Sequence, residues 1–407
     1  MMDNQYQMPR LLFLLATLPL LSAQFISSDT YTRYELLAPD THQFRITYEV
    51  TETTPLAKFH YNIIRPGSEA TDEAVYDAAT GKPLKFEMVT GEQAKKDSPE
   101  QRFTPDAHYI KIQLAHPVGS PDGEYRLRIM KTYMDAKSYY ADGPSKIVFT
   151  RPLGIPRNSV VLPAGYELVQ TSMAAQVLAE PDGRLRLGFV NPGSGGQLEV
   201  KIMARLLPGF KTSPAKMPGE RAHQDREILY ELLDPSTNAF RITHDYTESR
   251  AGRAHYFNVV RTGSHVSDPG SIDLDSGTLL KYEVMTGKEA KTRKIPLDEG
   301  NDDSEVVVTF FDKPVAAGTS MRLRLMETYT DPKSYFMDGG EIVWTRTFGR
   351  ARNTVVLPKG WTITAMDTPA IVQTLPDGRV SVYTVNPRND EVRVFFRARK
   401  RPEETKQ

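Results

Sequence analysis

One segment combines side chains that can recognise a ligand, and it occurs twice. Residues 132–143 read Thr-Tyr-x-Asp-x-Lys-Ser-Tyr-x-x-Asp-Gly, and residues 328–339 repeat the pattern. A tyrosine offers a flat apolar ring and a hydroxyl, which suit stacking on sugars or peptides, and an arginine can hold a carboxylate through two parallel hydrogen bonds. The candidate binding residues are therefore Tyr133, Asp135, Lys137, Tyr139, Asp142 and Arg157 in the first occurrence, and Tyr329, Asp331, Lys333, Tyr335, Asp338 and Arg352 in the second.

The same segment also has a purely structural interpretation. It follows an alternating stretch and contains turn residues, so we expect a loop at the edge of a sheet. The tyrosines can pack as corner residues while the aspartates cap turns, and Arg151 or Arg157 can pair internally with Asp135 or Asp142. Because structural corners are what duplicated folds share, the sequence favours this interpretation over ligand binding.

Catalytic chemistry has weaker support. Asp135 with Asp142, and Asp331 with Asp338, would resemble the carboxylate pair of a glycosidase if an open cleft held them about 5 to 10 Å apart. Arginine-paired turn positions would instead indicate a scaffold. The run Gly193–Gly196 lacks the pattern of a serine-nucleophile elbow, and no phosphate loop occurs. We therefore predict no catalytic residue and no cofactor.

Metal binding is equally weakly supported. The eight histidines are scattered along the chain, and none forms the His-Glu-x-x-His arrangement. The acidic stretch Asp298–Asp303 carries enough oxygens for calcium but lacks regular ligand spacing, so we interpret it as a solvated hairpin loop. We predict no metal site.

An internal duplication determines the expected architecture. The tetrapeptide Tyr34–Leu37 recurs as Tyr230–Leu233, at an offset of 196 residues, and Arg126–Gly143 matches Arg322–Gly339 at 12 of 18 positions. Farther along, Pro-Asp-Gly-Arg at 181–184 recurs at 376–379, at an offset of 195. The chain is therefore expected to contain two copies of one module of about 175 residues.

Within each copy the hydrophobic period is two. Tyr125, Leu127 and Ile129 alternate with Arg126 and Arg128, as in a strand with one buried face. Asp-Gly pairs at 182–183 and 377–378 separate such runs and indicate hairpins. No window predicts an amphipathic helix longer than two turns.

The predicted fold class is all-β, with two tandem copies of a large antiparallel β-sandwich. About a dozen strands are expected in each copy, more than the seven to nine of an immunoglobulin-like domain. Two small sandwiches side by side are the alternative, but no linker-like stretch divides either copy.

The N-terminal segment is typical of a signal peptide. Arg10 precedes an apolar run from Leu11 to Leu21, and Ser22-Ala23 supplies a cleavage site after Ala23. The expected organisation is a signal peptide at 1–23, copy 1 at 24–206, a Pro- and Gly-rich linker at 207–226, copy 2 at 227–399 and a charged tail at 400–407.

Composition and charge limit the classes of partner and the cellular location that we expect. Lys plus Arg and Asp plus Glu are both 51, so no bulk charge favours nucleic acid or an anionic membrane surface. No other run of about 18 apolar residues is present, so no membrane span is expected once the signal peptide is removed. Cysteine is absent, which leaves packing alone to stabilise each copy. We expect a bacterial protein exported to the periplasm or secreted.

The phrases Lys-Ser-Tyr before Asp-Gly, Thr-Arg, and Arg-Asn-x-Val-Val-Leu-Pro resemble those of uncharacterised exported bacterial proteins with repeated β-domains. That resemblance covers both copies and implies fold and location only. In size and strand density each copy is also similar to the N-terminal β-domain of certain zinc aminopeptidases. The zinc-binding helix and the Gly-x-Met-x-Asn motif of that family are missing, so its activity is not transferred.

The sequence thus favours a non-enzymatic envelope protein whose loops or edge strands bind a protein or a glycan. A hydrolase acting on glycan or peptide and a structural spacer are the alternatives. The oligomeric state is left open.

Overall fold

A computed structural model describes residues 30–119, 123–191, 198–212, 219–224, 227–297 and 299–402. The all-β prediction is confirmed, since strands arranged in six sheets dominate the described residues. The predicted signal peptide and the Gly193–Gly196 run lie outside the described residues.

The first half contains three sheets. In spatial order, the largest consists of β12 (Gln176–Ala179), β13 (Leu185–Val190), β10 (Arg157–Val161), β1 (Thr30–Leu36), β2 (Gln43–Glu52), β7 (Tyr125–Met134) and β4 (Glu69–Asp77). A second sheet consists of β11 (Tyr166–Thr171), β14 (Leu198–Leu206), β9 (Lys146–Leu153) and β8 (Tyr139–Ala141). The third consists of β3 (Phe59–Ile63), β6 (His108–Gln113) and β5 (Phe86–Thr90).

The second half has three corresponding sheets, of which the largest contains one more strand than its counterpart. Equivalent strands follow one another in the same order, read here from the opposite edge for the two larger sheets. The largest sheet of this half consists of β19 (Thr278–Leu279), β18 (His265–Asp273), β22 (Met321–Thr330), β16 (Ala239–Glu248), β15 (Glu227–Leu232), β25 (Arg352–Val356), β28 (Val380–Val385) and β27 (Ile371–Thr374). The others are β23 (Tyr335–Asp338), β24 (Glu341–Phe348), β29 (Val392–Lys400) and β26 (Trp361–Met366), and β17 (His255–Val259), β21 (Glu305–Phe310) and β20 (Lys281–Thr286).

Pairing between named strands is antiparallel except at one place in each half. There β1 lies parallel to β10, with Tyr34 opposite Val160, and β15 lies parallel to β25, with Tyr230 opposite Val355. A period of two predicts a strand but not its neighbour, so the sequence did not reveal this pair.

Helices are few and short among the described residues. They are α1 (Gly91–Asp97), α2 (Gly287–Thr292) and the 3₁₀ turns η2 (Pro39–Thr41) and η3 (Pro235–Thr237). No helix in the described part of the chain is long and apolar enough to cross a membrane.

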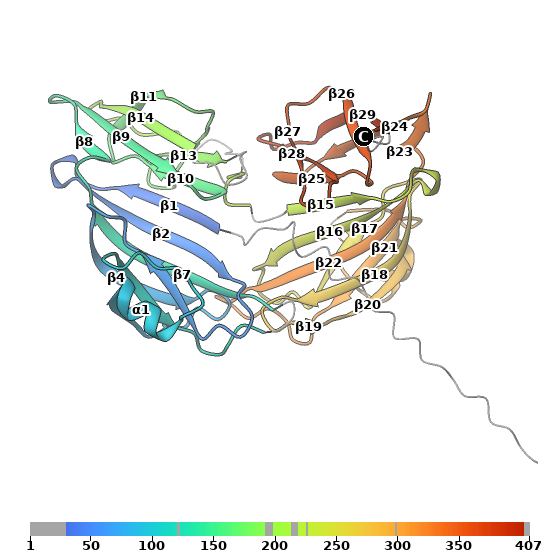
Figure 1. Ribbon diagram of the computed structural model, residues 1–407, viewed down its shortest axis with the longest axis horizontal. Coiled ribbons are helices and arrows are strands. Elements are labelled where there is room, and N and C mark those ends of the chain that lie inside the picture. Colours follow the sequence, from blue (N-terminus) through green and yellow to red (C-terminus); the bar gives the residue numbers. More distant parts are fainter. Residues whose placement is uncertain are drawn as a thin grey trace, which may run out of the picture.

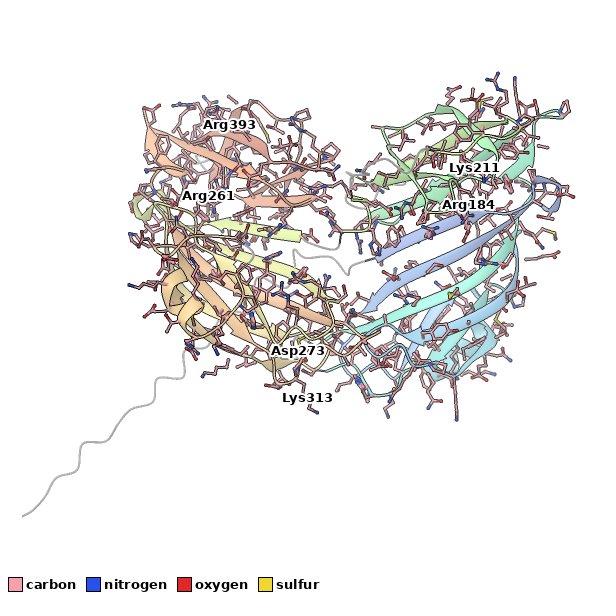
Figure 2. All side chains as sticks on the ribbon, turned by 180° about the vertical axis from the view of Figure 1, so that it is seen from behind. Arg184, Lys211, Arg261, Asp273, Lys313 and Arg393 are labelled. Carbon is pink, nitrogen blue, oxygen red and sulfur yellow. The ribbon has the colours of Figure 1, made fainter. Side chains whose placement is uncertain are left out.

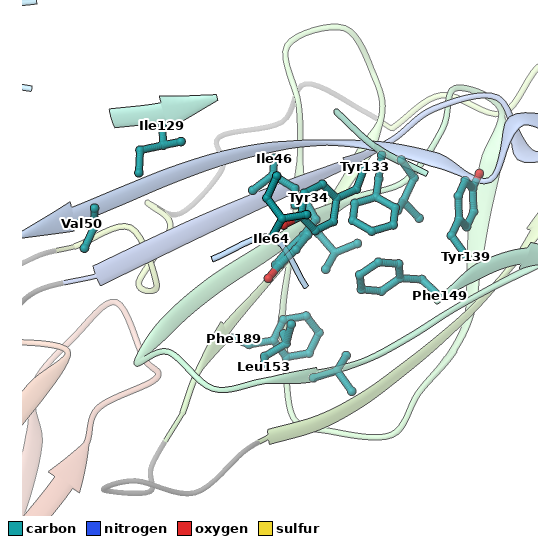
Figure 3. Packing of buried hydrophobic residues seen from close by; sticks show 14 of the residues in the cluster. Tyr34, Ile46, Val50, Ile64, Ile129, Tyr133, Tyr139, Phe149, Leu153 and Phe189 are labelled. Atoms are coloured by element: carbon teal, nitrogen blue, oxygen red, sulfur yellow. The ribbon is translucent and has the colours of Figure 1, made fainter. Parts of the chain in front are cut away.

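The largest hydrophobic cluster of each half lies mainly between its largest sheet and its four-stranded sheet. On β7, Tyr125, Leu127 and Ile129 are buried, as the alternation predicts. Phe44 on β2 meets Phe149 on β9 edge to face, with 5.7 Å between ring centroids. Figure 3 shows the rings of Tyr34, Tyr133 and Phe149 gathered in this layer. In the first half one continuous cluster also includes Ile110 of the three-stranded sheet. In the second half part of the three-stranded sheet, including Tyr256, packs with Leu323 in a cluster separate from the largest one.

The two halves stand side by side and converge at one end (Figure 1). Strands β1–β14 form one arm and β15–β29 the other, and the strands β7 and β22 approach each other where the arms meet. The arrangement leaves the described linker residues 219–224 between the arms, and these residues contact both of them.

Candidate functional site

The repeated Tyr/Asp segment is mostly strand and core rather than a free loop. Residues up to Met134 complete β7, and Tyr139 already begins β8, so the turn is confined to Asp135–Ser138. Both Tyr133 and Tyr139 are buried, at 2% and 0% exposure, and the Tyr139 hydroxyl donates to the Leu37 carbonyl at 2.8 Å. Their rings are therefore unavailable for stacking on a ligand at the surface.

The second copy repeats this geometry. Tyr329 and Tyr335 are buried, and the Tyr335 hydroxyl donates to the Leu233 carbonyl at 2.7 Å. In both copies the pair of tyrosines closes the core at the end of the longest strand pair.

Asp135 organises its own turn and holds an arginine. Its Oδ1 accepts from the backbone amides of Lys137 and Ser138 at 3.1 Å, and its Oδ2 accepts from Arg151 Nη1 at 3.2 Å. Burial alone would raise the pKa of Asp135, but the hydrogen bonds from Ser138 and the charge of Arg151 outweigh it, and the pKa is lowered. This is the arginine-paired turn position that the sequence associated with a scaffold.

Asp331 has the same role in the second copy. It accepts from the amides of Lys333 and Ser334 and pairs with Arg346 at 2.9 Å. Burial opposes its ionisation, yet the Ser334 hydrogen bond and Arg346 lower its pKa.

The remaining predicted residues divide between the surface and the interior. Lys137, Asp142, Lys333 and Asp338 are exposed, and Asp338 pairs with Arg397 at 3.0 Å. Neither of the two cavities described below is lined by either proposed carboxylate pair. The geometry thus does not place Asp135 with Asp142, or Asp331 with Asp338, on opposite walls of those cavities.

Arg157 and Arg352 have separate environments although they occupy equivalent positions. Both are 2% exposed. Arg352 pairs with Glu227 inside its own half. Arg157 donates to the carbonyls of Ala222 and His223, at 3.0 and 2.9 Å, and so ties the linker to the first half.

The junction between the halves is built from polar contacts. Arg126 makes a bidentate pair with Asp275, at 2.6 and 2.8 Å, and also donates to Ser320. Glu124 donates its backbone amide to the Leu274 carbonyl at 2.6 Å, and Ser320 donates its amide to the Ala79 carbonyl at 3.1 Å. Figure 2 shows Asp273, two residues before Asp275, at this end of the molecule.

These contacts use the same two segments of each copy. By the offset of 196 residues, Ala78-Ala79 corresponds to Leu274-Asp275, and Glu124–Arg126 corresponds to Ser320–Arg322. Glu124–Arg126 of the first half contacts Leu274-Asp275 of the second half, and Ser320 of the second half contacts Ala78-Ala79 of the first. The halves are therefore related by an approximate twofold exchange at the junction.

A cleft of about 670 Å³ lies beside the junction and is lined by both halves. Equivalent residues of the two halves both line it, Thr51 with Thr247 and Arg126 with Arg322. Its walls hold one carboxylate, Glu49, and six arginines: Arg126, Arg128, Arg157, Arg221, Arg322 and Arg350. Arg128 pairs with Glu49 at 2.9 Å, Arg126 with Asp275 at 2.6 Å and Arg322 with Glu124 at 3.9 Å, so half of the arginines in the lining are balanced by carboxylates.

Two of these arginines lack a carboxylate partner within the described residues. The buried Arg221 donates to the carbonyls of Gly349 and Asn386 at 3.1 and 3.4 Å, and Arg350 makes no side-chain hydrogen bond or ion pair among the residues described. Burial, together with the positive charge of Arg350, lowers the pKa of Arg221. An anion in the cleft would supply the missing negative charge.

The cleft is not evident from the sequence, although the arginines that line it are. Arg126 opens the longest repeated match, and Arg221 lies in the segment interpreted as a linker. The six arginines come from three strands, the linker and a loop, so only the tertiary arrangement brings them together.

The metal and calcium candidates do not form a site in the described residues. Across these ranges no group of three or more His, Asp or Glu side chains is arranged to hold a metal ion. In the acidic loop Asp302 pairs with Lys291, and Asn301 Oδ1 accepts from Ser304. Asp298 lies outside the described residues.

The chain matches no protein-family model and no curated protein.

Proposed function

We propose that the protein binds an anionic glycan, carrying carboxylate or phosphate groups, in the cleft between its two halves. The observation that carries the proposal is the lining of this cleft, with six arginines and one glutamate drawn from both halves. Guanidinium groups hold carboxylates and phosphates through paired hydrogen bonds of fixed geometry.

The uncharged part of the lining favours a sugar over a protein. Thr51, Gln224, Thr247, Ser249 and Ser320 supply hydroxyl and amide groups that suit a hydroxyl-rich ligand. Apolar lining is confined to a few residues, including Val50 and Leu127. Protein interfaces depend on buried aromatic and apolar anchors, which this cleft offers sparsely.

The location forms part of the same proposal. The N-terminal segment, with its apolar run and small residues at Ser22-Ala23, supports export to the bacterial envelope. Anionic polysaccharides and phosphate polymers of that compartment are the ligand class that the arginines suit.

Binding to defined polymers tests the proposal. The probes are polygalacturonate and poly(glycerol phosphate), with neutral dextran for comparison, measured by co-sedimentation or affinity electrophoresis at low and high salt. We expect the anionic polymers, and not dextran, to bind at low salt, and added salt to weaken binding because it screens exposed charges. Polyadenylate is included as an anionic polymer without glycan character.

Substitutions locate the site. We expect Arg350→Glu to weaken binding about tenfold, the scale of one lost charge-assisted hydrogen bond. Arg128→Gln, which alters only the cleft, should weaken it less because Arg128 already pairs with Glu49. Arg393→Glu is the matched control, since Arg393 is exposed on the second half away from the cleft lining (Figure 2). Absence of binding to both anionic glycans, tighter binding of polyadenylate, or equal loss in the control would refute the proposal.

A further inference from the structure

A second cavity lies wholly within the second half and differs in its electrostatics. It encloses about 460 Å³ between the largest sheet, the three-stranded sheet and the loop after β24. Its walls hold three arginines and three glutamates: Arg261, Arg346, Arg350, Glu299, Glu327 and Glu391. The arginine-rich cleft has excess positive charge, whereas this cavity carries both signs in equal number.

Glu327 is a buried acid without a cation. It is 5% exposed, and Asn258 Nδ2 donates to its Oε2 at 2.8 Å. Within the described residues no Lys, Arg or His lies within ion-pair distance of it. Burial raises the pKa of Glu327 to about 7, although hydrogen bonds from Asn258 and Tyr329 act in the opposite direction.

Arg261 is a cation without an acid on another wall of the same cavity. Its Nη2 donates to the backbone carbonyl and the hydroxyl of Thr347, at 3.1 and 2.9 Å. No carboxylate forms an ion pair with it among the described residues, and burial, aided by the charge of Arg346, lowers its pKa. Arg346, another arginine of this cavity, is already paired with Asp331.

Buried charges in proteins are paired, and each unpaired one costs free energy. Here Glu327, which is buried, and Arg261, which is partly buried, line one cavity, and neither has an oppositely charged partner among the described residues. A ligand with an ammonium at one end and a carboxylate at the other would satisfy both. Ile228, Ile242 and Leu325 give the cavity an apolar wall against which a side chain could pack.

We propose that this cavity binds a small zwitterion of the amino acid or short-peptide class, with its ammonium against Glu327 and its carboxylate against Arg261. The site is separate from the glycan cleft, although Arg350 lines both. The proposal does not depend on glycan binding.

The first copy shows why the site belongs to one half only. Lys131 occupies the position equivalent to Glu327, and its Nζ donates to Asn62 Oδ1, while Asn62 itself is equivalent to Asn258. The lysine is also buried, at 5% exposure. The fold thus tolerates either charge at this position, and a lysine there would repel a ligand ammonium.

Calorimetric titration of the full chain with alanine, Ala-Ala and Ala-Ala-Ala tests the proposal. We expect at least one of the three to bind, and the N-acetylated and C-terminally amidated forms of that peptide each to lose at least tenfold in affinity. Failure of all three free forms to bind at millimolar concentration would overturn the proposal, as would equal binding of the capped forms.

Substitutions assign the two ends. Glu327→Lys, which installs the residue of the first copy, should abolish binding of the free peptide, and Glu327→Gln should reduce it to the level of the N-acetylated form. Arg261→Gln should match the loss caused by amidation. Arg65→Gln, at the equivalent position of the first copy, is the matched control and should leave binding unchanged. Unaltered affinity in Glu327→Lys, with a folded variant, would contradict the assignment.

Discussion

At the scale of single residues, one position carries opposite buried charges in the two copies. Lys131 and Glu327 are equivalent, and each is hydrogen-bonded to the equivalent asparagine, Asn62 or Asn258. An asparagine can serve both, because its amide presents an oxygen to the ammonium and an NH₂ group to the carboxyl. Burial shifts both pKa values toward about 7, downward for Lys131 and upward for Glu327.

These two shifts predict opposite dependences of stability on pH. Between about pH 4.5 and 7 the folded protein keeps the Glu327 proton that the unfolded chain releases, so the free energy of unfolding falls as pH rises. Between about pH 7 and 10.5 the unfolded chain keeps the Lys131 proton that the folded protein has lost, so the free energy rises with pH. Together, the two groups lower the free energy of unfolding most near neutral pH.

We therefore expect Glu327→Gln to equal the parent in stability near pH 4.5 and to exceed it at pH 8, by on the order of 3 kcal/mol. Lys131→Met should gain most at pH 6 and lose its advantage toward pH 10. Urea denaturation at pH 4.5, 6, 8 and 10 measures both effects. Parallel stability curves for parent and variants would contradict the assignment of the two pKa shifts.

At the scale of elements, each residue of the repeated Thr-Gly pair has a structural role. Thr90 and Thr286 cap α1 and α2 through capping boxes with Gln93 and Glu289. The glycine that follows is needed because a neighbouring strand connection passes close by. A Cβ on Gly91 would lie 1.9 Å from the Thr104 carbonyl oxygen, and one on Gly287 would lie 2.0 Å from that of Asn301.

Gly91→Ala should accordingly lower the free energy of unfolding by roughly 2 kcal/mol, since the backbone around Thr104 must move to admit the methyl group. Thermal and urea denaturation measure the change. Gly219→Ala is the control, because nothing lies within 4 Å of its Cβ position and no positive φ is required there. A loss in Gly91→Ala no larger than in the control would show that the close approach is relieved without cost.

Elements were more predictable from the sequence than the site was. Alternation identified β7 and β22, and Asp-Gly placed the turns in which Gly183 and Gly378 have φ near +88° and +84°. Lys131 has the same parity as Leu127 and Ile129 and so lies on their buried face, but the alternation was followed only as far as Ile129 and the buried lysine was not predicted. The cleft escaped because proximity of Arg126, Arg221 and Arg350 depends on how two folded halves dock, and periodicity carries no information on docking.

At the scale of the whole molecule, two buried ion pairs link the halves among the described residues: Arg126 with Asp275, and Arg322 with Glu124 at 3.9 Å. Arg126 and Asp275 have side chains only 10% and 18% exposed, and Asp275 also accepts from the backbone amide of Arg322 at 2.9 Å. Removing one partner of such a pair leaves the other charge desolvated and unpaired, which costs more than a surface ion pair.

Asp275→Ala should therefore uncouple the halves. Both tryptophans, Trp344 and Trp361, lie in the second half, so their fluorescence follows that half, whereas circular dichroism follows both. We expect the two urea transitions to coincide in the parent and to separate in Asp275→Ala. Asp338→Ala, which removes an exposed ion pair within the second half, is the control. Transitions that stay as coincident as in the parent would show that other contacts suffice.

The exchange of equivalent segments at the junction gives the two halves of this chain the arrangement that two subunits have in a twofold-symmetric homodimer. Two identical subunits must present identical walls to a ligand on their symmetry axis, and every substitution appears twice. Joining them in one chain removes that constraint, and equivalent positions can then differ. In this chain Asp275 corresponds to Ala79, Arg350 to Ile155 and Glu327 to Lys131. The tether also keeps the partner at high effective concentration, so a small polar junction is enough to hold the assembly together.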